Sequence, residues 1–195
     1  MTWLALVRHG PTEWNALGRM QGRVDMPLSD EGRGSISRSR LPVEWLGWTL
    51  LASPLLRAQE TAQLLANRKP RSESALIEQD WGAWEGRTLA DIASSGDEAQ
   101  AGTGLDFLPL RGESPRMVQE RLKPFLQEVA RIGDPVVAVT HKGVIRAIMG
   151  LATGWDFMGK PPVRFDWRAG HLFKLAPDGT PTVYQANISL SKLDE

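Results

Sequence analysis

A short apolar run near the N-terminus, Trp3–Val7, most constrains the fold of this chain, because it has almost no polar positions. A continuous apolar run of this length is typical of a strand that is covered on both faces. The run leads directly into Arg8, His9 and Gly10, where the strand should reach the edge of a sheet. In open α/β sheets, ligands bind at the carboxyl ends of the strands. The stretch therefore predicts a buried strand that ends at a ligand site.

The rest of the chain alternates between further strands and helices. Buried strands are expected at residues 48–53 and 136–140, a short strand or extended stretch at 75–78, and a hairpin over 172–186. Apolar spacing and helix-start residues predict helices at 55–67, 115–132 and 144–151, and a short polar helix at 30–40. This alternation predicts an α/β fold with a mostly parallel sheet.

The length and composition indicate one ordinary globular domain. The 195 residues suffice for one sizeable core, and we expect a single domain over 1–195 with an insertion or lid at about 94–114. Lys and Arg number 23 and so do Asp and Glu, which gives no charge argument for nucleic acid or an anionic membrane surface. No signal peptide or membrane-spanning run is visible, and cysteine is absent, so we expect a cytoplasmic protein.

The expected strand order would gather two arginines, two histidines and one carboxylate at one sheet edge. These residues are Arg8, His9, Arg57, Glu78 and His141. Fixed cationic donors of this kind suit a phosphate group. A neutral histidine among them could attack phosphorus, and neighbouring arginine charge favours the neutral imidazole. The pattern therefore predicts a phosphoryl-transfer site.

A carboxylic acid is also needed to protonate the leaving alkoxide. Glu78 is the best-placed candidate, since it follows a predicted extended stretch and precedes a glycine-rich loop. Spacing alone does not choose it over Glu13, Asp80 or Glu85.

Five blocks of the sequence, taken in order, resemble the histidine phosphatase superfamily, in the branch that includes the cofactor-dependent phosphoglycerate mutases. They are VRHGPTEWN (7–15), QGRVDMPLS (21–29), SPLLRAQETA (53–62), LIEQDWGAWEG (76–86) and VTHKGVIR (139–146). The resemblance implies a three-layer sandwich in which a mostly parallel central sheet is flanked by helices.

The resemblance also implies a role for each matching residue. His9 would be the phosphorylated nucleophile and Glu78 the proton donor. The phosphate pocket would be formed by Arg8, Arg57 and His141, and Asn15 would reach the phosphate from its loop. Gln21 and Gly22 would help to line the entrance. The family needs no metal, and no cofactor is expected.

Lys142 departs from the small residue that is common after the second histidine of the family. It would either contact an acidic substrate or point to solvent. Trp81 and Trp84 would either line the pocket or pack against the loop, and His171 is expected to be structural.

The function that we expect is that of a phosphoric monoester hydrolase of the histidine acid phosphatase type, acting on a small phosphorylated metabolite through phosphohistidine on His9. A phosphoglycerate mutase is the first alternative, and a phosphoprotein phosphatase or a non-catalytic phospholigand-binding module is a further one. Residues 94–114 hold one basic residue, Arg111, and four acids, which favours hydrolysis over transfer. The oligomeric state stays open, with a homodimer as one alternative.

Overall fold

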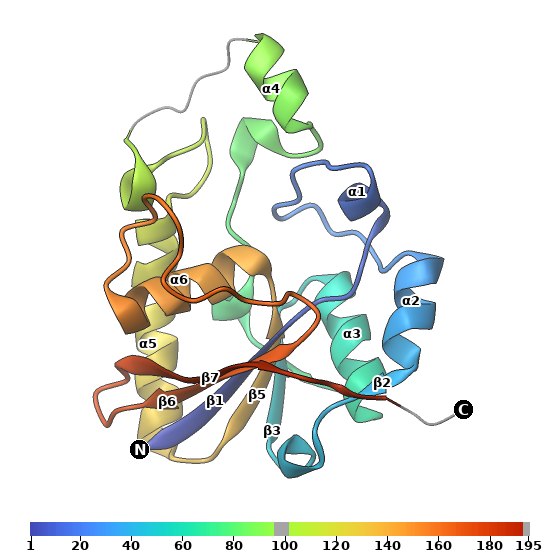
Figure 1. Ribbon diagram of the computed structural model, residues 1–195, viewed down its shortest axis with the longest axis vertical. Helices are drawn as coiled ribbons and strands as arrows, with labels where there is room; N and C mark the ends of the chain where they lie inside the picture. Colours follow the sequence, from blue (N-terminus) through green and yellow to red (C-terminus); the bar gives the residue numbers. More distant parts are fainter. Residues whose placement is uncertain (96–101, 193–195) are drawn as a thin grey trace.

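The computed structural model describes residues 1–95 and 102–192, and its centre is a mainly parallel sheet (Figure 1). Within these residues the main sheet has six strands in the order β4-β3-β5-β1-β6-β7. Their bounds are Thr2–Arg8 (β1), Thr49–Ala52 (β3), Arg71–Ser72 (β4), Val136–Thr140 (β5), Gly170–Leu175 (β6) and Pro181–Ile188 (β7). Neighbours among β4, β3, β5 and β1 are parallel, whereas β6 is antiparallel to both β1 and β7. Ser39–Arg40 (β2) and Ser191–Lys192 (β8) form a separate small antiparallel pair.

The helices cover both faces of this sheet (Figure 1). The α-helices are Glu13–Ala16 (α1), Asp30–Ser37 (α2), Leu56–Ala66 (α3), Leu89–Ser95 (α4), Pro115–Ile132 (α5) and Lys142–Thr153 (α6). Short 3-10 helices lie at Val43–Trp45, Ser74–Leu76, Gly82–Trp84 and Gly104–Asp106. The longest helix, α5, has the ends that its sequence predicts: the Ser114 side chain caps it, Pro115 is its first residue, and Gly133 ends it with φ 85°.

Alternate residues of β1 divide the core into two layers. Leu4 and Leu6 pack with residues of α5 and α6, whereas Ala5 and Val7 pack with residues of α3. A strand that is buried on both faces has no polar side, which explains the continuous apolar run in its sequence. The predicted three-layer α/β sandwich is confirmed.

One predicted strand is wrong. The residues of the expected strand 75–78 lie partly in the 3-10 helix Ser74–Leu76, and the strand that pairs with β3 is Arg71–Ser72 instead. Its two residues are exposed, so no apolar pattern marks it. Glu73 accepts a hydrogen bond from the Ala75 backbone N–H at 3.0 Å, which starts the helical turn that buries Leu76.

Other predictions concern the ends of elements and the predicted lid. The polar helix ends at Ser37 rather than at Arg40, because the chain then joins the small sheet as β2. Residues 96–101 of the predicted lid lie outside the described residues; of the rest, Gly104–Asp106 forms a 3-10 helix. In the described part of the chain, no helix has the length and apolar character needed to cross a bilayer.

Candidate active site

The ends of three neighbouring parallel strands bring the two motif histidines together. The His9 N–H donates to the Thr140 carbonyl at 2.9 Å, and the Ser53 N–H donates to the Val139 carbonyl at 3.0 Å. These bonds continue the sheet pairing one residue beyond β1 and β3. The rings of His9 and His141 consequently lie 5.1 Å apart, centroid to centroid.

One ring nitrogen of His9 has no hydrogen bond to any residue that the structure describes. Its Nδ1 lies 2.7 Å from the Gly10 carbonyl oxygen, which can only accept, so Nδ1 carries the proton and Nε2 holds the lone pair. Gly10 is itself held by an N–H bond to the Thr61 hydroxyl at 2.9 Å. Burial, followed by the charges of Arg8 and Arg57, lowers the pKa of His9 well below its ordinary value of 6.5. His9 is therefore a neutral imidazole with Nε2 available.

Arg57 is fully buried and is held by the loop that follows α1. Its Nη1 donates to the Val24 carbonyl at 2.9 Å, and its Nη2 donates to the Gly22 carbonyl at 2.7 Å. The Glu85 carboxylate fixes the same loop by accepting the backbone N–H groups of Arg23 and Val24 at 2.6 and 3.1 Å. A Cβ on Gly22 would meet this carboxylate at 1.8 Å, so a larger residue there would displace Glu85 from the loop backbone.

Three buried nitrogens at this edge have no hydrogen-bond partner among the described residues. They are Nε of Arg8, Nε of Arg57 and Nδ1 of His141. The other His141 nitrogen, Nε2, lies 2.7 Å from the Ser53 hydroxyl, which orients the ring. Buried polar groups are usually paired, and a group of unpaired donors next to a neutral histidine fits a bound oxyanion.

Glu78 reaches the same edge through bonds to its backbone. The Thr140 hydroxyl donates to the Leu76 carbonyl at 2.8 Å, and Nη2 of Arg121 donates to the carbonyls of Ile77 and Glu78 at 2.6 and 3.3 Å. Arg121 lies on α5, so the helix holds the segment that carries the acid. This part of the site had no signal in the sequence motifs.

The carboxyl group of Glu78 is buried and receives two backbone donors. The N–H groups of Gln79 and Gly143 lie 2.8 and 3.3 Å from its oxygens, and a Cβ on Gly143 would meet Oε1 at 2.4 Å. Burial raises the pKa of Glu78 above its ordinary value of 4.5, although these hydrogen bonds and the charges of Arg57 and Arg8 oppose the shift. A raised carboxyl pKa favours the protonated form that a general acid needs.

The structure separates Glu78 from the other three carboxylates considered. Glu85 binds the loop backbone, Asp80 accepts from the Gly82 N–H and pairs with Arg23 at 3.6 Å, and Glu13 lies in the first turn of α1. Of the four, only Glu78 lines the cavity that contains His9.

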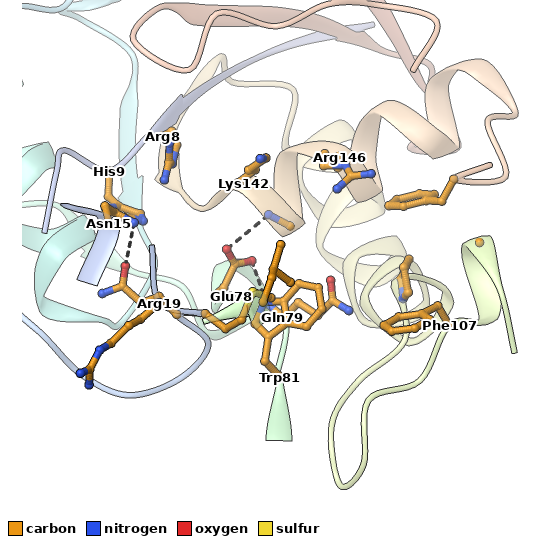
Figure 2. Close-up of a pocket in the computed structure, with 17 residues that line it drawn as sticks. Arg8, His9, Asn15, Arg19, Glu78, Gln79, Trp81, Phe107, Lys142 and Arg146 are labelled. Atoms are coloured by element: carbon orange, nitrogen blue, oxygen red, sulfur yellow. Dashed lines mark hydrogen bonds between the residues drawn. The ribbon is translucent and has the colours of Figure 1, made fainter. Parts of the chain in front are cut away.

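This cavity is called the main cavity below, and Figure 2 shows the residues that line it. Its volume is about 520 Å³. That volume is typical of sites for small molecules. It is lined by Arg8, His9, Asn15, Arg19, Met20, Gln21, Glu78, Gln79, Trp81, Leu89, Gly104, Phe107, Pro115, Lys142, Gly143, Arg146 and Phe157. Arg57 and His141 are fully buried behind this lining.

The predicted substrate-binding residues have different positions. Asn15, Gln21 and Lys142 line the main cavity, and the Asn15 amide donates to Gln21 Oε1 at 3.4 Å. Gly22 does not line it; its carbonyl holds Arg57 instead, which corrects the expectation that it lines the entrance.

Trp81 and Trp84 were each expected either to line the pocket or to pack against the loop, and the structure places them differently. Trp81 lines the cavity, whereas Trp84 is buried and stacks on it with ring centroids 6.2 Å apart.

Several lining residues were not singled out from the sequence. Arg19, Phe107, Arg146 and Phe157 belong to this group. Arg146 lies four residues after Lys142, so one face of a helix was the signal available for it. The others come from loops, where position depends on the whole fold.

His171 lies outside the main cavity. It is buried on β6, its ring stacks on Phe165 with centroids 4.1 Å apart, and Nδ1 accepts from the Asn187 N–H at 3.3 Å. Burial lowers the pKa of His171 to about 4. These contacts are those of a structural residue. Within residues 1–95 and 102–192, no group of three or more metal-ligating side chains is positioned to hold an ion.

The sheet, the histidine pair and the buried arginine fit the family that the sequence blocks resemble, and a comparison with known protein families gives the same family. The profile of the Histidine phosphatase superfamily (branch 1) matches residues 4–188. The chain belongs to this family.

Relatives include both phosphatases and mutases. The chain is 32% identical to glucosyl-3-phosphoglycerate phosphatase of Mycolicibacterium vanbaalenii, over 80% of this chain and 78% of that one. It is also 32% identical to 2,3-bisphosphoglycerate-dependent phosphoglycerate mutase of Azorhizobium caulinodans, over 91% and 94% of the two chains. A crystal structure of phosphoserine phosphatase from Entamoeba histolytica has the same fold, with a TM-score of 0.80 at 24% identity, covering 96% and 97% of the chains.

Proposed function

We propose that this protein hydrolyses small phosphorylated metabolites through a phosphohistidine on His9. One observation carries the proposal: at one sheet edge, His9 Nε2 and buried nitrogens of Arg8, Arg57 and His141 all lack a hydrogen-bond partner among the described residues. Glu78 lines the same cavity and supplies the acid. The phosphatase relative supports hydrolysis of a phosphate ester by the same family.

In the first half-reaction the Nε2 lone pair of His9 forms a bond to phosphorus, and the ester P–O bond breaks. The Glu78 carboxyl proton passes to the leaving alkoxide oxygen. Arg8, Arg57 and the His141 Nδ1–H stabilise the charge on the transferring group. His141 can donate from Nδ1 because the Ser53 hydroxyl can donate to its Nε2.

In the second half-reaction the Glu78 carboxylate takes a proton from water, and the water oxygen attacks phosphorus. The N–P bond breaks, which releases orthophosphate and restores neutral His9. Each group returns to its starting protonation state, so no metal or organic cofactor is required by this route.

A phosphoglycerate mutase is the second candidate, and one observation favours it. The described part of the insertion brings no cation to the main cavity, as its composition suggested, but Arg19, Lys142 and Arg146 enter from other segments. A mutase needs such extra charge to hold a doubly phosphorylated intermediate.

The proposal is tested by phosphate release from an aryl phosphate and from 3-phosphoglycerate, with chelator present, for the wild type and His9→Ala. Acid-labile phosphate on the quenched wild-type protein, absent from His9→Ala, is expected, with loss of turnover by at least about 10⁴-fold. His171→Phe is the matched control, since this histidine lies outside the cavity. If the folded wild-type protein releases no phosphate but interconverts phosphoglycerates, the protein is a mutase. If it has neither activity, the non-catalytic phospholigand-binding module is the alternative that is left.

The predicted cytoplasmic location and a homodimer both await direct measurement. Cell fractionation tests the first, and light scattering of the purified protein tests the second.

A further inference from the structure

The main cavity has more positive charge than one phosphate group can use. Four basic side chains line it, Arg8, Arg19, Lys142 and Arg146, and Glu78 is the one carboxylate among its described lining residues. In the proposed mechanism Arg8 and the buried Arg57 bind the transferring phosphate. Three cations therefore remain for the rest of the substrate.

Lys142 and Arg146 form a pair on α6. They are four residues apart, so they lie on the same face of the helix, where two like charges destabilise each other. Neither makes a hydrogen bond or an ion pair with any described residue; the Lys142 Nζ lies 5.3 Å from the Trp167 ring centroid, and the Arg146 guanidinium lies 5.0 Å from that of Trp155. The aromatic rings support the two cations and leave their N–H donors free for a ligand.

A second hollow, the side cavity, meets the main cavity at this pair. Its volume is about 400 Å³, and it shares Lys142 and Arg146 with the main cavity. It adds a third cation, Arg164, and its described lining residues include no carboxylate. In the view of Figure 2, Arg8, Lys142 and Arg146 succeed one another along one side of the main cavity. An anion next to Lys142 and Arg146 would thus be beside the phosphate position. Glu78 is the one carboxylate among the described lining residues of the main cavity, and the described lining of the side cavity adds none.

We propose that Lys142 and Arg146 bind a second anionic group of the substrate. The preferred substrates are then phosphomonoesters whose alcohol portion carries an oxyanion, either a carboxylate or a second phosphate. The planar guanidinium of Arg146 suits two oxygens of such a group, and Lys142 adds a point charge. This inference rests on the proposed hydrolysis, and it assigns these residues to specificity rather than to the bond-breaking step.

The sharpest test uses two substrates that differ in one group. 3-Phosphoglycerate and glycerol 1-phosphate share the ester and the carbon chain, but the first has a carboxylate where the second has a hydroxymethyl group. We expect the wild-type kcat/KM to be about tenfold or more higher for the carboxylate, which is the effect of one or two charge-assisted hydrogen bonds. Glycerol 1,3-bisphosphate has a second phosphate in place of the carboxylate. Its kcat/KM, compared with that of 3-phosphoglycerate, shows which of the two anions the enzyme prefers.

Variants assign the preference to its residues. Lys142→Gln and Arg146→Gln should each lower the kcat/KM ratio of the pair, and the double variant should bring it near one. Arg168→Gln is the matched control: this arginine is exposed and lines neither cavity, so the ratio should stay at the wild-type value. Arg19→Gln tests the remaining cation of the main cavity.

Several results would overturn the inference. One is a wild-type ratio near one while both esters are hydrolysed, which would leave the proposed function intact. Another is loss of the preference in Arg19→Gln but not in the α6 variants. If the wild type hydrolyses no ester, including the aryl phosphate, the proposed function fails. Calorimetric binding of 3-phosphoglycerate and glycerol 1-phosphate then tests the inference. It requires that 3-phosphoglycerate binds more tightly and that Arg146→Gln weakens this binding. Thermal melting of each variant checks folding.

Discussion

The two halves of the main cavity are built in different ways. The inner half consists of the lining residues Arg8, His9 and Glu78 together with Arg57 and His141, which do not line the cavity. Backbone bonds at the sheet edge and bonds from side chains to backbone carbonyls hold it, and four of these five side chains are buried. The outer half, Arg19, Trp81, Phe107, Lys142 and Arg146, comes from loops and one face of α6. The difference teaches that the groups proposed to react are positioned by the ends of the sheet strands, whereas the groups proposed to bind the rest of the substrate are positioned by loops and by one helix.

After His9→Ala, the largest effect should follow from Glu78→Gln, which removes the acid of the inner half. We expect kcat/KM to fall by up to about 10⁴-fold for an alkyl phosphate and by less for an aryl phosphate, whose leaving group needs less protonation. Steady-state kinetics with both esters measures this. Glu13→Gln is the control, since this carboxylate does not line the cavity. Equal losses for both esters would show that Glu78 does not act as the acid.

The same variant should change the pH profile. Activity needs neutral His9, whose pKa is lowered, so activity should persist below pH 6.5 and disappear only as the pH falls through that lowered pKa. It also needs protonated Glu78, whose pKa is raised, so activity should decline as the pH rises through a value above 4.5. Profiles of kcat/KM against pH should be measured for the wild type and for Glu78→Gln. The alkaline decline that deprotonation of Glu78 causes in the wild type should be absent from the variant. An unchanged alkaline limb would assign it to the substrate.

Arg57→Met should cost about 10²- to 10³-fold in kcat/KM, because it removes a fixed donor for the transferring phosphate. It also leaves the Gly22 and Val24 carbonyls without their donor, so the melting temperature should fall. Arg19→Gln, the matched change in the outer half, should cost less than about tenfold for an aryl phosphate without a second charge. Similar losses of kcat/KM in Arg57→Met and Arg19→Gln would contradict the distinction between the inner and the outer half.

Arg121→Gln should lower kcat by about tenfold, although Arg121 does not line the cavity. The variant loses the donors to the Ile77 and Glu78 carbonyls, so Glu78 is less well positioned, and the alkaline limb should move with it. Arg116→Gln, which breaks only an exposed pair with Asp106, is the control. A fall in melting temperature without a change in kcat or in the pH profile would reduce Arg121 to a structural role.

The smallest effect is expected in the outer half. Trp81→Leu should raise KM by only a few-fold and leave kcat near that of the wild type, because a lining ring contributes to binding before and during reaction alike. Trp81 variants measured with substrates of increasing size would show where the leaving group lies. A large loss of kcat would extend the inner half to this loop.

The inner half was predictable because its residues follow apolar runs. Arg8 is the last residue of β1, His9 and His141 come directly after β1 and β5, and parallel strands end at the same edge. The sequence favoured Glu78, but spacing alone could not separate it from Glu85, since its position depends on Arg121 of α5 and on Gly143, both distant in sequence. β4 was missed because two exposed residues leave no pattern, and Arg146 because a cation on a helix face is usually solvated.

The position of β1 in the sheet also bears on how the chain is made. β1 is synthesised before the other strands of the sheet, yet its two neighbours, β5 and β6, begin at Val136 and Gly170. Until most of the chain has left the ribosome, this apolar strand has both edges unpaired, which is the condition that invites aggregation and chaperone binding. Pairing across such sequence separations is also slow. The strand that ends next to His9 therefore spends the longest time during biogenesis without its neighbours, and truncated chains that lack residues after 135 should be insoluble.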